Sequence, residues 1–163
     1  MKKYSIILLL FLTSCSFETP TKFSEKALNE NLISIQNETV LFKEIIEKYQ
    51  GKKVLINVWA SWCADCIKGL PELKKIQKSY PSVIFLNISV DENSLGWRKG
   101  IERFQILGEH YNLPKGMKNG DLVDFLNLRW IPRYIIVDEK GSISLFKATK
   151  ITDERILATI KTN

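Results

Sequence analysis

Two cysteines, Cys63 and Cys66, stand three positions apart in the segment Trp-Cys-Ala-Asp-Cys, where a β-favouring run gives way to a helical pattern. The free backbone N–H groups and the positive dipole end of a helix N-terminus stabilise an anion, so Cys63 is expected to form a thiolate and act as the nucleophile. Cys66, one turn further on, can attack the sulfur of Cys63, close a small disulfide ring and release a substrate held as a mixed disulfide. The spacing therefore predicts a redox-active dithiol.

Other uses of the two cysteines fit the sequence less well. A structural zinc site needs four ligands, and the remaining sources would be Cys15 and the sole histidine, His110. A c-type haem site needs a histidine directly after Cys66, where the chain has Ile67. A purely structural disulfide that closes so short a loop would constrain little chain entropy. A redox pair is favoured, with no metal and no cofactor expected.

The first fifteen residues predict export. Lys2 and Lys3 precede an apolar run at 6–12 and then small polar residues, which is the order of a secretory signal peptide. The run is much shorter than the about 20 residues that span a bilayer. Leu-Thr-Ser-Cys at 12–15 resembles the lipobox of bacterial lipoproteins, and this resemblance implies cleavage before Cys15 and lipidation of that residue. The weaker alternative is an ordinary cleaved signal peptide in which Cys15 is an incidental thiol.

The composition indicates one soluble folded domain. The chain has 163 residues, 45% hydrophobic and 26% charged, which suits a single packed core. Lys and Arg number 24 against 18 Asp and Glu, a net charge of +6 that becomes +4 without Lys2 and Lys3. No dense basic run is interleaved with aromatic residues, which disfavours nucleic-acid binding. We expect a signal peptide over 1–14, a polar tether over 15–30 and one domain over 31–163.

The elements that must position the dithiol alternate between strands and helices. The run at 54–60 is almost continuously β-favouring, as in a central strand buried on both faces. Two strand–helix units with parallel crossovers are followed by an antiparallel hairpin, so the α/β fold is expected to have a mixed sheet with helices on both faces. The expected strands lie at 32–35, 54–60, 83–90, 133–137 and 142–146, the expected helices lie at 40–49, 63–81, 94–107, 121–128 and from Thr152 onward, and 109–118 is expected to be a loop.

The segment 51–66 resembles the thioredoxin superfamily, and more closely its exported ResA/TlpA-like thiol-disulfide oxidoreductases. The run Ile-Pro-Arg-Tyr-Ile-Ile-Val-Asp at 131–138 matches the proline loop of this family and the strand that follows it. The resemblance implies a three-layer thioredoxin-like fold in which Pro132 is cis and lies beside the dithiol. It also implies that the backbone of Ile131 pairs with an extended substrate. Trp62 would flank the site and contact the substrate.

Three positions depart from the family pattern. Asn57 stands where cytosolic thioredoxins carry a buried aspartate, and Gly69 stands where some exported members place a glutamate, so the base that deprotonates Cys66 is unidentified. Asp65 lies between the cysteines, where its charge would repel a thiolate on Cys63. This repulsion favours the disulfide over the dithiol and therefore predicts a reducing protein.

The sequence thus predicts a thiol-disulfide oxidoreductase in the cell envelope, anchored to a membrane through Cys15 and facing the periplasm or the outside. Its expected reaction is the reduction of disulfides in exported proteins. The family resemblance implies that a membrane-embedded thiol donor supplies the electrons. An oxidase or isomerase that uses the same two cysteines is an alternative. A Cu(I) chaperone of thioredoxin fold is another, although such proteins typically space their cysteines one residue wider.

Overall fold

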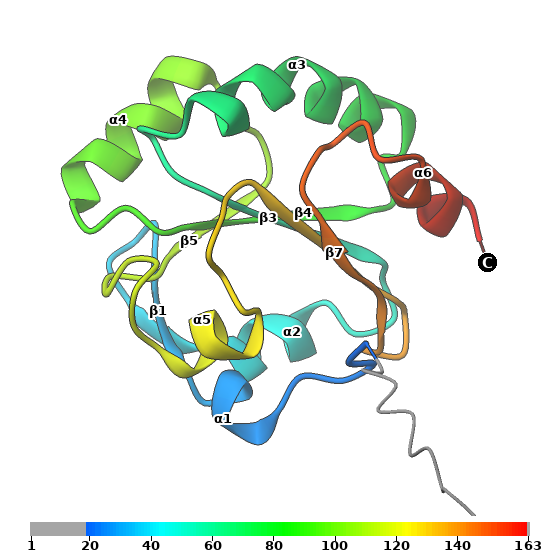
Figure 1. Cartoon of the computed structure of the whole chain (residues 1–163), viewed down its shortest axis with the longest axis horizontal. Helices are drawn as coiled ribbons and strands as arrows, with labels where there is room; N and C mark the ends of the chain where they lie inside the picture. The colour runs from blue at the N-terminus through cyan, green and yellow to red at the C-terminus, as the bar shows by residue number, and fades with distance from the viewer. Residues whose placement is uncertain (1–18, 163) are drawn as a thin grey trace, which may run out of the picture.

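The computed structural model describes residues 19–162. Figure 1 shows a twisted sheet between helices, with α3, α4 and α6 on one side and α1, α2 and α5 on the other. The sheet has seven strands in the order β2-β1-β5-β4-β3-β6-β7. The strands are β1 Asn31–Ser34, β2 Thr39–Leu41, β3 Val54–Trp59, β4 Ile84–Ser89, β5 Glu109–Asn112, β6 Arg133–Val137 and β7 Ile143–Ala148, and the helices are α1 Glu25–Leu28, α2 Phe42–Lys48, α3 Ala64–Ser79, α4 Ser94–Phe104, α5 Asp121–Phe125 and α6 Glu154–Lys161.

Strand β3 lies inside the sheet, between a parallel β4 and an antiparallel β6. All six of its side chains are buried, which confirms the central strand expected at 54–60. Because β3 and β4 are parallel, their carboxyl ends meet at the same edge of the sheet. The turn into α3 and the turn into α4 therefore lie next to each other, and the first of these turns carries the dithiol.

Helix α3 is held on the sheet by side chains spaced three or four residues apart. Cys66, Leu70, Leu73 and Ile76 are all buried on its inner face, the period expected of an amphipathic helix. Pro71 lies inside the helix. These contacts fix the first turn of α3 against the sheet. The side chain of Cys63, the N-cap of the helix, is therefore held in one orientation.

Two strands depart from the sequence prediction. The expected loop at 109–118 contains β5, which pairs in parallel with β4 and antiparallel with β1. The expected helix at 40–49 contains β2 at its start. Neither strand has the apolar alternation that marks a strand in sequence, since each is formed by pairing with a neighbour across the sheet. The helix expected from Thr152 onward begins at Glu154, because Asp153 is its N-cap and accepts the backbone N–H of Arg155 with its side chain.

The expectation of a tether over 15–30 is wrong for the residues from Phe23 onward, which pack against the domain. The ring of Phe23 meets that of Phe42 edge to face, with 4.9 Å between the ring centroids. Ala27 of α1 is fully buried. The predicted lipid-modified Cys15 and the predicted signal peptide at 1–14 lie outside the described residues. Within residues 19–162, no helix has both the length and the apolar character needed to cross a bilayer.

Candidate active site

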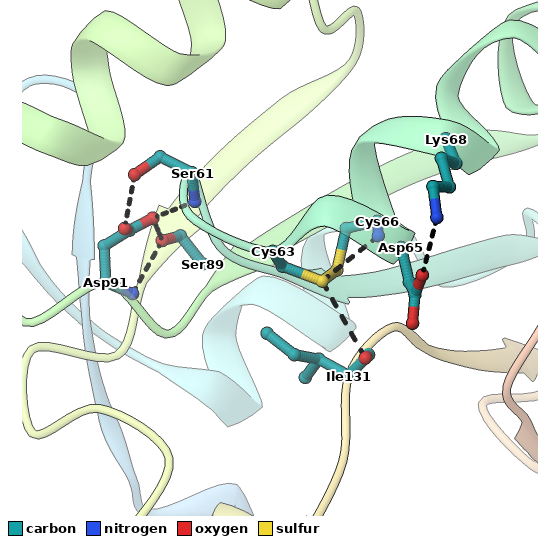
Figure 2. The surroundings of a disulfide bond; sticks show 8 residues. All are labelled: Ser61, Cys63, Asp65, Cys66, Lys68, Ser89, Asp91 and Ile131. Carbon is teal, nitrogen blue, oxygen red and sulfur yellow. Dashed lines mark hydrogen bonds and ion pairs between the residues drawn. A yellow bond between two sulfur atoms is a disulfide. The ribbon is translucent and has the colours of Figure 1, made fainter.

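Cys63 and Cys66 are joined by a disulfide, with their Cα atoms 5.3 Å apart. Cys63 is the N-cap of α3, and the backbone N–H of Cys66 donates to its Sγ at 3.1 Å (Figure 2). Both sulfurs belong to side chains that are less than a tenth exposed. The same N–H and the helix dipole would stabilise a thiolate on Cys63 after reduction. The spacing correctly predicted that the two cysteines meet at a helix start.

The proline loop lies directly against the dithiol. The Ile131–Pro132 peptide bond is cis, as the family resemblance implied. The carbonyl oxygen of Ile131 lies 3.8 Å from Cys63 Sγ (Figure 2). At the end of the loop, the buried Arg133 donates to the carbonyl of Leu126 at 2.7 Å, and burial lowers the pKa of its guanidinium. This bond closes the segment 126–133 and holds the loop beside the sulfur.

Two tryptophans border a hollow next to Cys63. Trp62 and Trp130 are 62% and 60% exposed, and the hollow of about 330 Å³ between them is also lined by Met117 and Ile131. Trp130 was not predicted, because nothing in the periodicity of its segment shows whether its side chain is exposed. Trp59, by contrast, is fully buried in the core.

A second hollow, of about 470 Å³, lies between α3, the proline loop and the segment before α6. Gly69 and Tyr134 both line it. A Cβ atom at Gly69 would lie 3.1 Å from the Tyr134 hydroxyl, so this hydroxyl takes up the space beside the glycine. Burial raises the pKa of Tyr134, and the group is therefore a neutral hydrogen-bond donor at physiological pH.

Asn57 is buried on β3 and pairs in register with Tyr134 on β6. Its amide nitrogen donates to Oδ1 of Asn87 at 3.0 Å, while its own Oδ1 is a buried acceptor without a partner in the described part of the chain. An amide does not ionise at physiological pH. Asn57 can therefore accept a hydrogen bond but cannot take the proton of Cys66 as a carboxylate would.

A buried carboxylate holds the turn in front of the dithiol. Asp91 follows the carboxyl end of β4 and accepts the backbone N–H and the hydroxyl of Ser61 at 2.8 and 2.7 Å, and the hydroxyl of Ser89 at 2.7 Å (Figure 2). Nδ2 of Asn112 donates to the carbonyl of Asp91 at 2.9 Å. Asp91 is 3% exposed, and each donor to its carboxylate is neutral. Asp91 was not predicted from the sequence, although a run of acidic and amide residues directly after an apolar strand is a signal for it.

The other predicted polar positions lie in different surroundings. Asp65 is half exposed and pairs with Lys68 at 3.5 Å (Figure 2), so part of its charge is compensated. His110 lies on β5, with β4 between it and the strand that precedes the dithiol. Its Nε2 lies 3.0 Å from the carbonyl oxygen of Ile106. Among residues 19–162, no three His, Cys, Asp or Glu side chains gather in a way that could hold a metal ion.

A sheet of this order with a dithiol at a helix start beside a cis-proline defines the thioredoxin-like class of redox proteins. The family model described as thioredoxin-like matches residues 51–143. The chain therefore belongs to the thioredoxin-like family, and its bonded cysteines place it among the thiol-disulfide oxidoreductases of that family. The fold and family predicted from the sequence are confirmed.

Relatives of this chain are named for thiol-disulfide exchange or for the thioredoxin-like fold. The thiol:disulfide interchange protein DsbE of Haemophilus influenzae is 30% identical over 146 residues, which is 86% of this chain and 77% of DsbE. The thioredoxin-like protein YneN of Bacillus subtilis is 34% identical over 107 residues, 62% of this chain but only 59% of YneN. The solution structure of a putative thiol-disulfide oxidoreductase from Bacteroides vulgatus superposes with a TM-score of 0.68 at 25% identity, covering 84% of this chain and 87% of that one.

Proposed function

We propose that this protein is a membrane-anchored, extracytoplasmic reductase of disulfides in exported proteins. One observation carries the proposal: Sγ of Cys63 accepts an N–H at the start of α3, borders an open hollow and is bonded to Cys66. A group in this position can attack an external disulfide and be released again by its neighbour.

The reaction follows from the two sulfurs. In the reduced protein the Cys63 thiolate attacks one sulfur of a substrate disulfide, forming a mixed disulfide while the other substrate sulfur leaves as a thiolate and takes up a proton. The Cys66 thiol then loses its proton and attacks Sγ of Cys63, so that the second substrate sulfur leaves and the Cys63–Cys66 disulfide forms. The second substrate sulfur also leaves as a thiolate and takes up a proton. The substrate thus gains two electrons and two protons: the protein supplies both electrons and the proton of Cys66, and the solvent supplies the other proton.

The charges near Cys63 support a reducing direction. The carboxylate of Asp91 is buried, bonded only to neutral donors and attached to Ser61, two residues before Cys63. A negative charge there opposes the thiolate and so favours the disulfide over the dithiol. Asp65 acts in the same direction but is exposed and paired with Lys68, so we assign the larger effect to Asp91.

The proline loop supports a binding role for three residues. We assign the backbone of Ile131 to pairing with an extended substrate segment, and Pro132 to holding that backbone beside the sulfur. The position of the Ile131 carbonyl, 3.8 Å from Cys63 Sγ, suits this role. Trp62 would also contact the substrate, because it lines the hollow that Cys63 and Ile131 line.

The anchor and the electron source are proposals from the sequence. Cys15 would carry the lipid, because it follows an apolar run and two small residues in the lipobox order. Two or more acyl chains on one residue give stable membrane attachment, whereas a single chain gives only marginal binding. A reductase outside the cytoplasm needs electrons from across the membrane, so we assign its re-reduction to a membrane-embedded thiol donor.

The direction of the reaction is tested with the purified full chain in detergent. Insulin reduction with dithiothreitol is measured for the wild type, Cys63→Ser and Cys66→Ser. We expect both variants to lose turnover, and Cys66→Ser alone to accumulate a mixed disulfide with the substrate. Equilibration with glutathione should give a potential nearer to that of thioredoxin, about −270 mV, than to that of DsbA, about −120 mV. A potential near the second value would identify an oxidase, and tight Cu(I) binding without turnover would identify a copper chaperone.

The anchor is tested separately in cells. The wild type should be found in the membrane fraction and incorporate labelled palmitate, whereas Cys15→Ser should do neither. Attachment of an alkyne-tagged palmitate to the Cys15→Ser variant would contradict the assignment. Insulin reduction by the same purified variant serves as the control, since Cys15 has no part in the redox step.

A further inference from the structure

Exposed apolar side chains gather at the dithiol more than elsewhere in the described part of the chain. Four large hydrophobic side chains are exposed within residues 19–162, at Trp62, Leu95, Leu107 and Trp130. The two tryptophans come from different loops yet line one hollow, in which Cys63 also lies. Exposed aromatic residues that gather around a concave site are typical of a contact surface rather than of scattered surface residues.

The hollow between the tryptophans continues in both directions. Trp62 and Met117 also line a hollow of about 400 Å³ that reaches Glu92. On the other side, Trp130 also lines the hollow of about 470 Å³ that reaches Tyr134. The three hollows thus adjoin, with Cys63 in the middle one. Their arrangement forms an open trough past the sulfur, a shape that suits an extended polypeptide segment.

Both indoles stand on backbone that is held in place. The loop of Trp130 is closed by the bond from Arg133 to the carbonyl of Leu126. The turn that carries Trp62 is held by the bonds from Ser61 to Asp91. Rigid aromatic side chains lose little conformational entropy when they bind a partner, so each indole is ready to contact one.

The charges at the hollow argue against selection by charge. Asp65 and Arg129 both line it, so neither sign dominates. The remaining side chains are the two tryptophans, Met117, Ala64, Ile131 and Cys63. The thioether of Met117 can adapt to apolar partners of different shape. The middle of the trough therefore suits an uncharged, apolar side chain.

We propose that Trp130 is a specificity-determining residue that, together with Trp62, selects substrates with an aromatic or large aliphatic side chain two residues from the reacting cysteine. The inference rests on the proposed function, in which Cys63 forms a mixed disulfide with the substrate. That bond fixes the substrate cysteine at Sγ of Cys63. Alternate side chains of an extended chain point to the same face, so the residue that shares the face of the cysteine lies two positions away, only about 7 Å further along. Its side chain consequently falls within the hollow that Trp62 and Trp130 border.

The test compares two disulfide-linked peptides that differ only in phenylalanine or serine two residues from the cysteine. The full chain reduces each peptide with dithiothreitol as the electron source, and the ratio of the two kcat/KM values is recorded. A ratio within one variant does not depend on the fraction of folded protein. We expect the wild type to prefer the phenylalanine peptide about tenfold, a difference of about 1.4 kcal/mol. Trp130→Ala should lower the ratio to about twofold, and Trp130→Phe should retain most of it.

The matched control is Leu107→Ala, which removes an equally exposed apolar side chain that does not line the hollow and should keep the wild-type ratio. An unchanged ratio in Trp130→Ala, or no preference in the wild type, overturns the inference while leaving the reductase intact. A small aliphatic disulfide is reduced in parallel. If the wild type reduces neither peptide nor this small disulfide, the proposed function fails, and the inference fails with it.

Discussion

The carboxylate of Asp91 accepts two hydrogen bonds from Ser61, at 2.8 Å from the backbone N–H and at 2.7 Å from the hydroxyl. The pair joins the carboxyl ends of two parallel strands, because Ser61 follows β3 and Asp91 follows β4. The turn that it fixes continues directly into Trp62 and Cys63. Asp91 is consequently a positioning residue for the nucleophile and, through its charge, an opponent of the thiolate.

We predict different consequences for two substitutions of Asp91, one on stability and one on the reactivity of Cys63. Asp91→Ala leaves the donors of Ser61 and Ser89 without an acceptor and should lower the free energy of unfolding by about 1–3 kcal/mol. Asp91→Asn keeps the size but removes the charge, so Cys63 should be alkylated at lower pH and the potential should become less negative. The measurements are urea denaturation, the pH profile of iodoacetamide reaction and glutathione equilibration. Glu102→Gln, which removes an exposed charge on α4, is the control. A pH profile of Asp91→Asn that matches the wild type would leave Asp91 with a structural role alone.

Two glycines of α4 provide a matched test of how tightly this helix packs on the same turn. A Cβ atom at Gly100 would lie 2.8 Å from Cβ of Ser61 and 3.2 Å from the ring of Trp59, whereas one at Gly96 would lie 3.5 Å from Oγ of Ser61. Alanine raises helix propensity at either site by up to about 1 kcal/mol. Gly96→Ala should therefore be neutral or stabilising, and Gly100→Ala should lose about 1–3 kcal/mol through overpacking. Equal urea midpoints for the two variants would show that α4 moves away at no cost.

The parts of the fold that were predicted from sequence are those with a local pattern. The buried run of β3 and the helical period after Cys63 were sufficient to place the dithiol. The polar strand β5 carries no such pattern, and it exists because β1 and β4 pair with it on either side. Asp91 was missed for a related reason, since its partner Ser61 is 30 residues away in sequence and only the parallel sheet brings the two together.

Lys53 makes a further contact that the sequence does not indicate, with the C-terminal end of α6. It reads as half of a solvated lysine pair, yet it is 9% exposed, and its ammonium group donates to the carbonyls of Ile160 at 3.1 Å, Thr159 at 3.2 Å and Thr162 at the end of α6. A cation at the C-terminus of a helix donates to carbonyls that lack a partner within the helix, and it interacts favourably with the negative end of the helix dipole.

We therefore predict that Lys53→Met lowers the free energy of unfolding by about 1–3 kcal/mol, because the last carbonyls of α6 lose their donor. Its exposed neighbour offers the control: Lys52→Met should change the unfolding free energy by less than about 0.5 kcal/mol. Urea denaturation compares the two, and hydrogen exchange of α6 amides locates the effect. Loss of stability without faster exchange in α6 would mean that Lys53 acts through its ion pair with Glu139, at 3.8 Å, rather than through the helix end.

His110 gives the protein a defined pH dependence of stability. Burial is the main cause that lowers the pKa of His110 below its ordinary value of 6.5, and the bond of Nε2 to the carbonyl of Ile106 only partly opposes it. Nδ1 is buried without a hydrogen-bond partner among residues 19–162, so protonation would place an unpaired donor in the interior. The folded state therefore favours the neutral ring.

Because the unfolded chain takes up a proton near pH 6.5 and the folded chain does so only at lower pH, the unfolded state binds more protons between these two values. The contribution of His110 to the unfolding free energy should accordingly be completely present above pH 6.5, and the unfolding free energy should fall as the pH is lowered through this window. Since His110 is the sole histidine, His110→Gln should remove most of this slope. Urea midpoints of both proteins at about pH 7.5 and about pH 5 measure it, in a range where few other side chains titrate. An equally steep loss in the variant would assign the slope to other groups and refute the role of His110.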